Sequence, residues 1–124
     1  MMKFSGLLLK ESLKDESVLD SVKITKTEIW NNVKNAVENQ PKNWTAIFFE
    51  FEGTEDEADI KAEIMSRALR GLWYLNFSGN EKIYVVFPDN KFYKYQKGDK
   101  EKRQEAIDYG FTIGIPQDQL DWGE

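Results

Sequence analysis

The residues best able to do chemistry lie in one segment, at 91–103, where basic and aromatic side chains are interleaved. The segment reads KFYKYQKGDKEKR. Basic groups neutralise phosphates and aromatic rings stack on bases, so this composition is typical of proteins that bind single-stranded nucleic acid. The candidate binding residues here are Lys91, Tyr93, Lys94, Tyr95, Lys97 and Arg103.

A structural interpretation of the same segment is also open. On a β-strand, Tyr93 and Tyr95 share one face while Phe92 and Lys94 share the other, so rings and charges need not converge on one ligand. Lysines also protect an exposed edge strand from pairing with another chain. The segment therefore indicates either a nucleic-acid or phosphate-ligand site or a lysine-protected edge strand, and we favour the edge strand.

A second charged feature is a cluster of six carboxylates within ten residues. Oxygen ligands of this kind bind Mg²⁺ or Ca²⁺, but the spacing is not that of an EF-hand loop. Acidic residues are also stabilising at the start of a helix, where they face the positive end of its dipole. We therefore expect a solvated acidic surface and predict no metal and no other cofactor. The cluster comprises Glu50, Glu52, Glu55, Asp56, Glu57 and Asp59.

The chain contains no histidine and no cysteine. Their absence excludes Ser-His-Asp and Cys-His catalysis, thiol redox chemistry, disulfides and the usual zinc sites. No P-loop, dinucleotide-binding glycine pattern or nucleophile elbow is present. Catalysis would have to use Asp and Glu, Lys or Tyr, so we expect a protein that is not an enzyme.

Composition predicts one globular domain over residues 1–124. Hydrophobic residues make up 40% of the chain and charged residues 31%, with a net charge of −5. An acidic, soluble protein of this kind does not bind nucleic acid non-specifically over its whole surface. No apolar run is long enough to cross a bilayer and no signal peptide is evident, so we expect a cytoplasmic protein without a membrane partner.

Hydrophobic periodicity and turn residues predict six strands and two helices. The expected strands are 3–10, 22–30, 44–52, 72–77, 82–87 and 91–95, with helices at 55–70 and 99–110 and an asparagine-rich loop at 31–43. Short turns join the last three strands, which indicates an antiparallel meander. The prediction is an α+β fold with a mostly antiparallel sheet of about six strands and the order βββα-βββα.

The first helix has the clearest boundaries. Thr54 and Glu57 form a capping box, and Gly71 is the expected residue after its end. Its expected core stripe consists of Ile60, Ile64, Ala68 and Leu72, together with Met65 and Leu69. The second helix is expected to begin after Asp99 and to stop at Gly110.

The terminal segment, residues 111–122, is expected to be extended because Pro116 disfavours both a long helix and a central strand. It ends in Leu120-Asp121-Trp122. Trp122 either packs into the core or serves as an exposed anchor for a partner, and we include it among the candidate binding residues.

Four segments of the second half resemble a family of small uncharacterised bacterial proteins. They are WYLNF (73–77), VVFPDNKFYKY (85–95), GDKEKRQEAIDYG (98–110) and GIPQDQLDW (114–122). Members of that family end in a similar Gly-x-Pro-x-x-Gln-Leu-Asp-Trp segment. The resemblance covers roughly residues 72–122 and implies that the terminal segment is part of the fold; it implies no activity.

These features predict a non-catalytic intracellular protein-interaction or binding module. Its partner is expected to be another protein, reached through the acidic segment, the terminal segment or a sheet edge. Binding of nucleic acid or a phosphate ligand at 91–103 is the alternative, and a small-ligand or carboxylate-based enzyme is the third interpretation. The sequence leaves open whether the aromatic residues fill the core or line a pocket.

Overall fold

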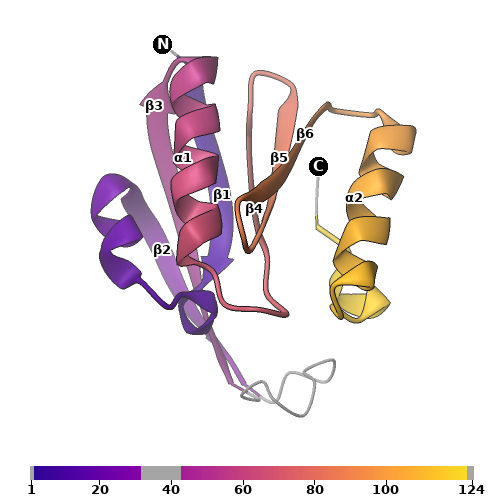
Figure 1. Cartoon of the computed structure of the whole chain (residues 1–124). Helices are drawn as coiled ribbons and strands as arrows, with labels where there is room; N and C mark the ends of the chain where they lie inside the picture. The colour runs from indigo at the N-terminus through magenta and orange to yellow at the C-terminus, as the bar shows by residue number, and fades with distance from the viewer. Residues whose placement is uncertain (1, 32–42, 123–124) are drawn as a thin grey trace.

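The computed structural model describes residues 2–31 and 43–122, and the predicted loop at 31–43 lies almost wholly outside them. A six-stranded antiparallel sheet has the order β2-β3-β1-β4-β5-β6 (Figure 1). The strands are β1 (Met2–Leu9), β2 (Lys23–Trp30), β3 (Trp44–Gly53), β4 (Leu75–Gly79), β5 (Lys82–Phe87) and β6 (Lys91–Gln96). The α+β prediction and the order βββα-βββα are confirmed.

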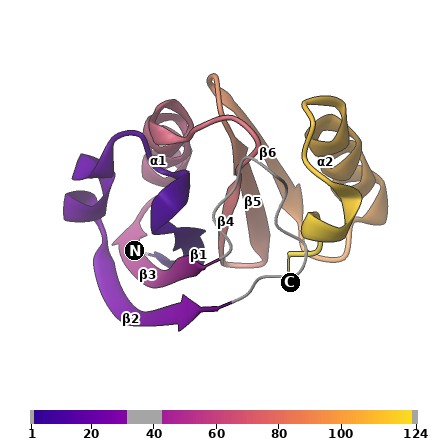
Figure 2. The ribbon, with the colours of Figure 1, turned by 90° about the horizontal axis from the view of Figure 1, so that it is seen from below.

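Two helices pack on opposite faces of this sheet. They are α1 (Glu55–Ala68) and α2 (Lys100–Thr112), and Figure 2 shows the sheet between them. Short 3-10 helices, η1 (Lys10–Ser12), η2 (Glu16–Ser21) and η3 (Gln117–Gln119), complete the described elements. No helix in the described part of the chain has the length and apolar character needed to span a membrane.

Helix α1 begins as predicted, but its buried stripe agrees only in part with the prediction. The Thr54 hydroxyl accepts from the Glu57 amide, and the Glu57 carboxylate accepts from the Thr54 amide. Met65, Ala68 and Leu69 of the predicted stripe are buried, as expected. Ile60 and Ile64 are 57% and 43% exposed, so the prediction is wrong at these two positions, and Ala58 and Ala62 face the core instead. The sheet face beneath is filled with phenylalanine and tyrosine rings, and small alanines let the helix pack closely against that bulk.

The end of α1 also differs from the prediction. Leu69 is extended and ends the helix, and Gly71 has no left-handed backbone. Leu72 instead adopts a positive φ of 68° and turns the chain. Residues 72–74 therefore connect α1 to the sheet, and β4 begins at Leu75 rather than at 72.

Helix α2 begins after Asp99 as predicted but continues past Gly110 to Thr112. The left-handed glycine that follows the helix is Gly114, with φ 103°. Gly110 instead allows close packing, because a Cβ there would come within 2.7 Å of the Leu120 side chain and 3.1 Å of the Phe87 ring. The segment predicted as extended, 111–122, therefore starts inside the helix and includes η3.

The sheet carries a hydrophobic core on each face. On the α1 side the core contains Phe4, Phe77 and Tyr84, all fully buried, and on the α2 side it contains Val85, Phe87 and Ala106. β3 and β5 are central strands, each lying between two neighbours, which agrees with the apolar residues on both of their faces.

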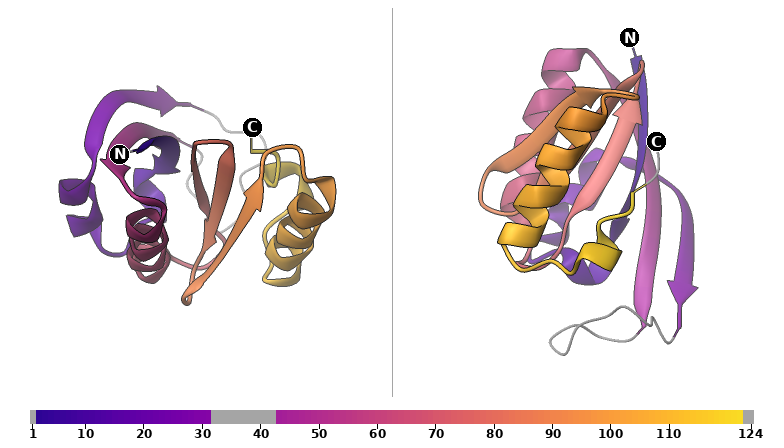
Figure 3. Two further views of the ribbon diagram at one scale, coloured as in Figure 1. Left: turned by 90° about the horizontal axis from the view of Figure 1, so that it is seen from above. Right: turned by 90° about the vertical axis from the view of Figure 1, so that its right-hand side faces the viewer.

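The α2 side of the sheet is only partly covered. Figure 3 shows α2 beside β5 and β6, far from β2 at the other end of the sheet. Strand register places Phe48, Leu7, Asn76, Val85 and Tyr93 in one row across this face. Val85 is fully buried, whereas Leu7, Phe48 and Asn76 are half-buried, so the β3-β1-β4 part of the row lies open.

Candidate functional site

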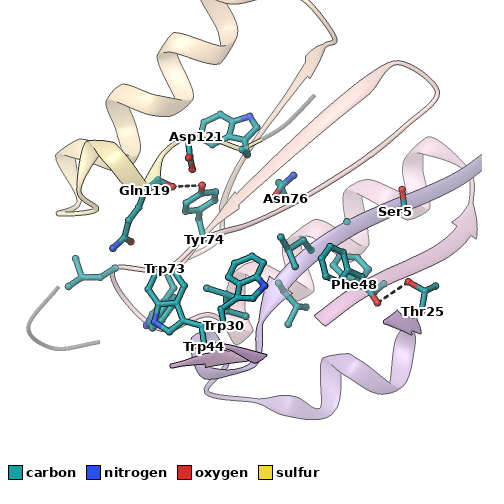
Figure 4. Close-up of a pocket in the computed structure, with 17 residues that line it drawn as sticks. Ser5, Thr25, Trp30, Trp44, Phe48, Trp73, Tyr74, Asn76, Gln119 and Asp121 are labelled. Carbon is teal, nitrogen blue, oxygen red and sulfur yellow. Dashed lines mark hydrogen bonds between the residues drawn. The ribbon is translucent and has the colours of Figure 1, made fainter. Parts of the chain in front are cut away.

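A pocket of about 660 Å³ occupies the open part of this face (Figure 4). Its lining includes all four tryptophans of the chain, Trp30, Trp44, Trp73 and Trp122. They come from the end of β2, the start of β3, the α1–β4 connection and the terminal segment. Small-molecule sites typically have this size and this predominance of aromatic lining with a few polar groups.

The pocket floor is built by alternation along the strands. Leu7 and Leu9 of β1 face the pocket because Phe4 and Leu8 point to the α1 core. Phe48 of β3 lies opposite Leu7 in the register. The floor is therefore apolar, and its residues keep partial exposure because neither α1 nor α2 packs over them.

Three tryptophans form one side of the pocket. Trp30 and Trp44 are directly opposite each other on β2 and β3. The rings of Trp44 and Trp73 meet edge to face, with centroids 5.3 Å apart. Figure 4 shows the three indoles gathered together. Trp44 and Trp73 are each 7% exposed, so they form a fixed wall, whereas Trp30 is 36% exposed.

Tyr74 of the α1–β4 connection and three residues of the terminal segment form the facing side. The three residues are Gln119, Asp121 and Trp122. The Tyr74 hydroxyl donates to the Gln119 carbonyl, and its ring meets that of Trp122 edge to face at 5.6 Å. Burial, and secondarily the Asp121 carboxylate, raise the pKa of Tyr74 above its usual range. Tyr74 is therefore a neutral hydrogen-bond donor that holds the terminal segment in place.

Two polar side chains of the lining have unused hydrogen-bonding capacity. The Asn76 carboxamide, half-buried on β4, and the exposed Asp121 carboxylate form no side-chain hydrogen bond or ion pair within residues 2–31 and 43–122. Asparagine is disfavoured in strands, and Asn76 sits in an otherwise apolar row of the floor. Both groups are therefore available to a ligand.

The described lining contains one carboxylate and no lysine or arginine. The cations nearest its aromatic rings already have partners. Lys26 lies 5.5 Å from the centroid of Phe48 and 2.8 Å from the Glu28 carboxylate. Arg103 lies 4.8 Å from the centroid of Trp122 and donates to its carbonyl at 2.7 Å. The pocket thus offers aromatic surface and hydrogen bonds without a ready anion-binding group.

The predicted binding residues at 91–103 do not form one surface. β6 is an edge strand, as the lysine-protected interpretation expects. Lys94 points to the α1 face, where its ammonium lies 2.8 Å from Glu55 and 3.1 Å from Asp59. Tyr93 and Tyr95 point to the α2 face, and Tyr95 is 3% exposed. Lys94 and the two tyrosines are therefore on opposite sides of the sheet, whereas Lys91 and Arg103 contact Tyr93 and Tyr95 on the α2 side.

Three of the predicted residues, Tyr95, Arg103 and Trp122, do come together. Trp122 is 5% exposed and its indole N–H donates to the Tyr95 hydroxyl at 2.8 Å, while the Arg103 guanidinium lies over its ring. The packed interpretation of Trp122 agrees with this burial, and an exposed anchor does not. Lys91 lies 4.9 Å from the Tyr93 centroid, and Lys97 is exposed in the turn after β6.

Lys94 belongs to a polar network that links α1 to the sheet. The fully buried Tyr84 donates to Asp59 at 2.7 Å, and Asp59 accepts from Lys94. Burial and the bond to Asp59 raise the pKa of Tyr84 above its usual range. The bond to Glu55 is the main cause of a raised pKa at Lys94. Both groups are held in their protonated forms, the opposite of what a general base or nucleophile requires.

The acidic cluster is mostly used in local contacts. Glu50 lies 3.2 Å from Lys3 and 3.8 Å from Lys23, Glu57 caps α1, and Glu55 and Asp59 pair with Lys94. Within the described residues, no group of three or more acidic side chains is placed to hold a metal ion.

Apart from Trp122, the sequence did not predict the pocket residues as a binding site. Each tryptophan follows the pattern of a core residue in its own segment, and nothing local links position 30 to 73. The one available signal was Asn76, an amide between the apolar residues of the predicted strand LWYLNF.

The comparisons with known proteins add no relative. The chain matches no protein-family model, no curated protein and no solved structure. The resemblance of residues 72–122 to small bacterial proteins therefore stays a prediction.

Proposed function

We propose that this protein is a non-catalytic binding module whose ligand enters the tryptophan-lined pocket. The observation that carries the proposal is the convergence of all four tryptophans on one cavity of about 660 Å³. Indole rings bury a large area with few rotatable bonds, so they favour binding when they surround a preformed site. We also propose a cytoplasmic location.

The chemistry of the lining supports binding over catalysis. Its ionisable or hydroxyl-bearing side chains are Asp121, Ser5, Thr25 and Tyr74. Thr25 donates to the Phe48 carbonyl and Tyr74 to the Gln119 carbonyl, so neither hydroxyl is paired with a base. A nucleophile needs a base within hydrogen-bond reach, and the described lining offers no such pair.

The ligand is either a small molecule or a side chain of a partner protein. Either ligand would pack on the aromatic rings of the pocket and form hydrogen bonds with its polar groups. Either is also compatible with the acidic net charge, which disfavours non-specific binding of nucleic acid. Nucleic-acid binding at 91–103 is less well supported, because Lys94 and Arg103 are engaged in internal contacts and Tyr95 is buried.

A pull-down with the intact tagged chain tests the proposal. Bound proteins and extracted small molecules are identified by mass spectrometry, with and without nuclease, for the wild type, Trp30→Ala and Phe111→Ala. Trp30 is a partly exposed pocket ring; Phe111 is 61% exposed and outside the pocket lining, so it is the matched control. The proposal expects a ligand retained by wild type and Phe111→Ala and reduced with Trp30→Ala.

Two results would contradict it. A ligand retained equally by all three proteins would bind elsewhere on the surface. Nuclease-sensitive nucleic acid as the only retained material would favour the 91–103 alternative instead.

A further inference from the structure

The pocket presents aromatic faces together with groups that bond to hydroxyls. The face of a sugar ring that carries axial C–H bonds is apolar and packs on an indole, while its hydroxyls point outward and act as both donors and acceptors. A ligand of that kind needs rings on one side and planar amide or carboxylate groups near the ring edge. Trp30, 36% exposed, supplies the accessible ring, with Trp44 and Trp73, each 7% exposed, beside it. Asn76 and Asp121 supply the polar groups.

Asn76 indicates a ligand independently of the tryptophans. Its carboxamide offers two donors and an acceptor, has no side-chain hydrogen bond within the described residues, and faces the pocket from a strand. The register places it beside Leu7 on one side and Val85 on the other. A β-branched apolar residue would suit that position better for folding, so the amide is best explained by a ligand that both donates and accepts.

The charge of the lining selects against anions. Asp121 is its one described carboxylate, and no lysine or arginine accompanies it. A phosphate or carboxylate on the ligand would be repelled by Asp121 without a compensating cation. Nucleotides are disfavoured for this reason, although their bases stack on aromatic rings.

We propose that the pocket binds a neutral saccharide, which rests on the proposed binding function. One sugar ring stacks on the tryptophan side while its hydroxyls donate to Asp121 and exchange hydrogen bonds with Asn76. The volume of about 660 Å³ suits a mono- or disaccharide unit, either free or at the end of a longer glycan.

The first experiment uses an array of immobilised glycans and the intact chain. Neutral hexose-containing glycans are compared with sialylated, sulfated and phosphorylated ones, and hits are confirmed by saturation-transfer NMR with the free disaccharide. Adenosine and adenosine monophosphate are included as planar ligands without and with a phosphate. The expected result is retention of one or more neutral glycans and loss of retention when the same glycan carries an anionic group.

The variant Asn76→Val separates recognition from folding. It removes the amide and leaves a residue that strands favour, so the melting temperature should not fall. Ser78→Val is the matched control, because Ser78 lies two residues along β4 on the same face and outside the pocket lining. Asn76→Val should weaken glycan binding by about tenfold or more, and Ser78→Val should leave it unchanged.

The possible outcomes test the saccharide inference separately from the proposed binding function. Binding of adenosine or of a partner protein in the pocket, with no neutral glycan retained, overturns the saccharide inference and leaves the binding function standing. Glycan binding unaffected by Asn76→Val also overturns it, because the sugar would then lie elsewhere. Equal retention of neutral and anionic glycans would likewise overturn the inference of a site for neutral saccharides.

Discussion

Trp122→Ala should destabilise the fold strongly although Trp122 is close to the end of the chain. The indole is 5% exposed and joins the core on the α2 side of the sheet. It donates to the Tyr95 hydroxyl, meets the Tyr74 ring edge to face, and carries the Arg103 guanidinium over its face. The substitution removes all three contacts at once.

The expected magnitude follows from burial and from the neighbouring pocket. Truncation of a buried Trp to Ala typically costs about 3–5 kcal/mol. Trp122 borders an open cavity, so water can enter the space that the indole leaves, and the cavity contribution is reduced. Loss of the hydrogen bond to Tyr95 adds about 1 kcal/mol. We therefore expect a loss of about 3–4 kcal/mol.

Urea unfolding followed by far-ultraviolet circular dichroism measures this loss from the change in midpoint at constant m. For a domain of this length the melting temperature should fall by roughly 10–15 °C. Trp30→Ala is the matched control, since it removes the same side chain from the same pocket at 36% exposure and should cost about 1 kcal/mol or less.

An unchanged midpoint for Trp122→Ala would refute the reasoning. It would mean that the terminal segment does not stay packed in solution. The pocket would then lack the side that Tyr74 and the terminal segment form together. Equal losses for Trp122→Ala and Trp30→Ala would show that burial does not separate the two positions.

Three further outcomes are expected. Gly6→Ala should lower stability by about 2 kcal/mol or more in urea unfolding, because its Cβ would lie 2.3 Å from the Asn76 carbonyl oxygen, whereas Gly71→Ala, with nothing within 4 Å, should be neutral or slightly stabilising. Tyr84→Phe should cost about 1–2 kcal/mol by the same measurement, since it removes a buried bond to Asp59. Thermal unfolding should shift to lower temperature as the pH rises through and above 10, the ordinary tyrosine pKa, because the raised pKa values of Tyr74 and Tyr84 favour the neutral phenol in the folded state and its stabilisation is lost once the unfolded chain can ionise. A melting temperature independent of pH in that range would contradict the last expectation.

Local chemistry made much of the fold predictable. The capping box at Thr54, the N-cap at Asp99 and the two tight turns of the meander each depend on a few adjacent residues. Asn80 and Glu81 form a two-residue connection between β4 and β5 and both adopt the positive φ that such a turn requires. Asp89 and Asn90, in the three-residue connection between β5 and β6, also have positive φ. Such signals are readable because the interacting groups are close in sequence.

The errors share a different cause. Ile60 and Ile64 have the spacing of a buried stripe, but so do Ala58 and Ala62, and periodicity alone does not choose between faces of one helix. The choice depends on the shape of the sheet face that receives the helix. Gly71 and Gly110 likewise fit an expected helix end by type, whereas the left-handed backbone occurs at Leu72 and Gly114.

The pocket follows from a mismatch between the sheet and the second helix. β3 carries apolar residues on both faces, as its sequence WTAIFFEFE already indicates, so both faces of the sheet need cover. α1 covers one face. The apolar contribution of α2 to the other is short, with Ala106, Ile107 and Tyr109 packing near β5 and β6.

A helix with so short an apolar stripe cannot cover a six-stranded face, so part of that face must remain open or be covered by something else. The order β2-β3-β1-β4-β5-β6 decides which part, because it puts β1 and β3 on the side away from α2. Aromatic rings from four distant segments then line the uncovered region. An apolar surface left open in this way is costly in water, and occupation by a ligand is the physical reason we give for its retention.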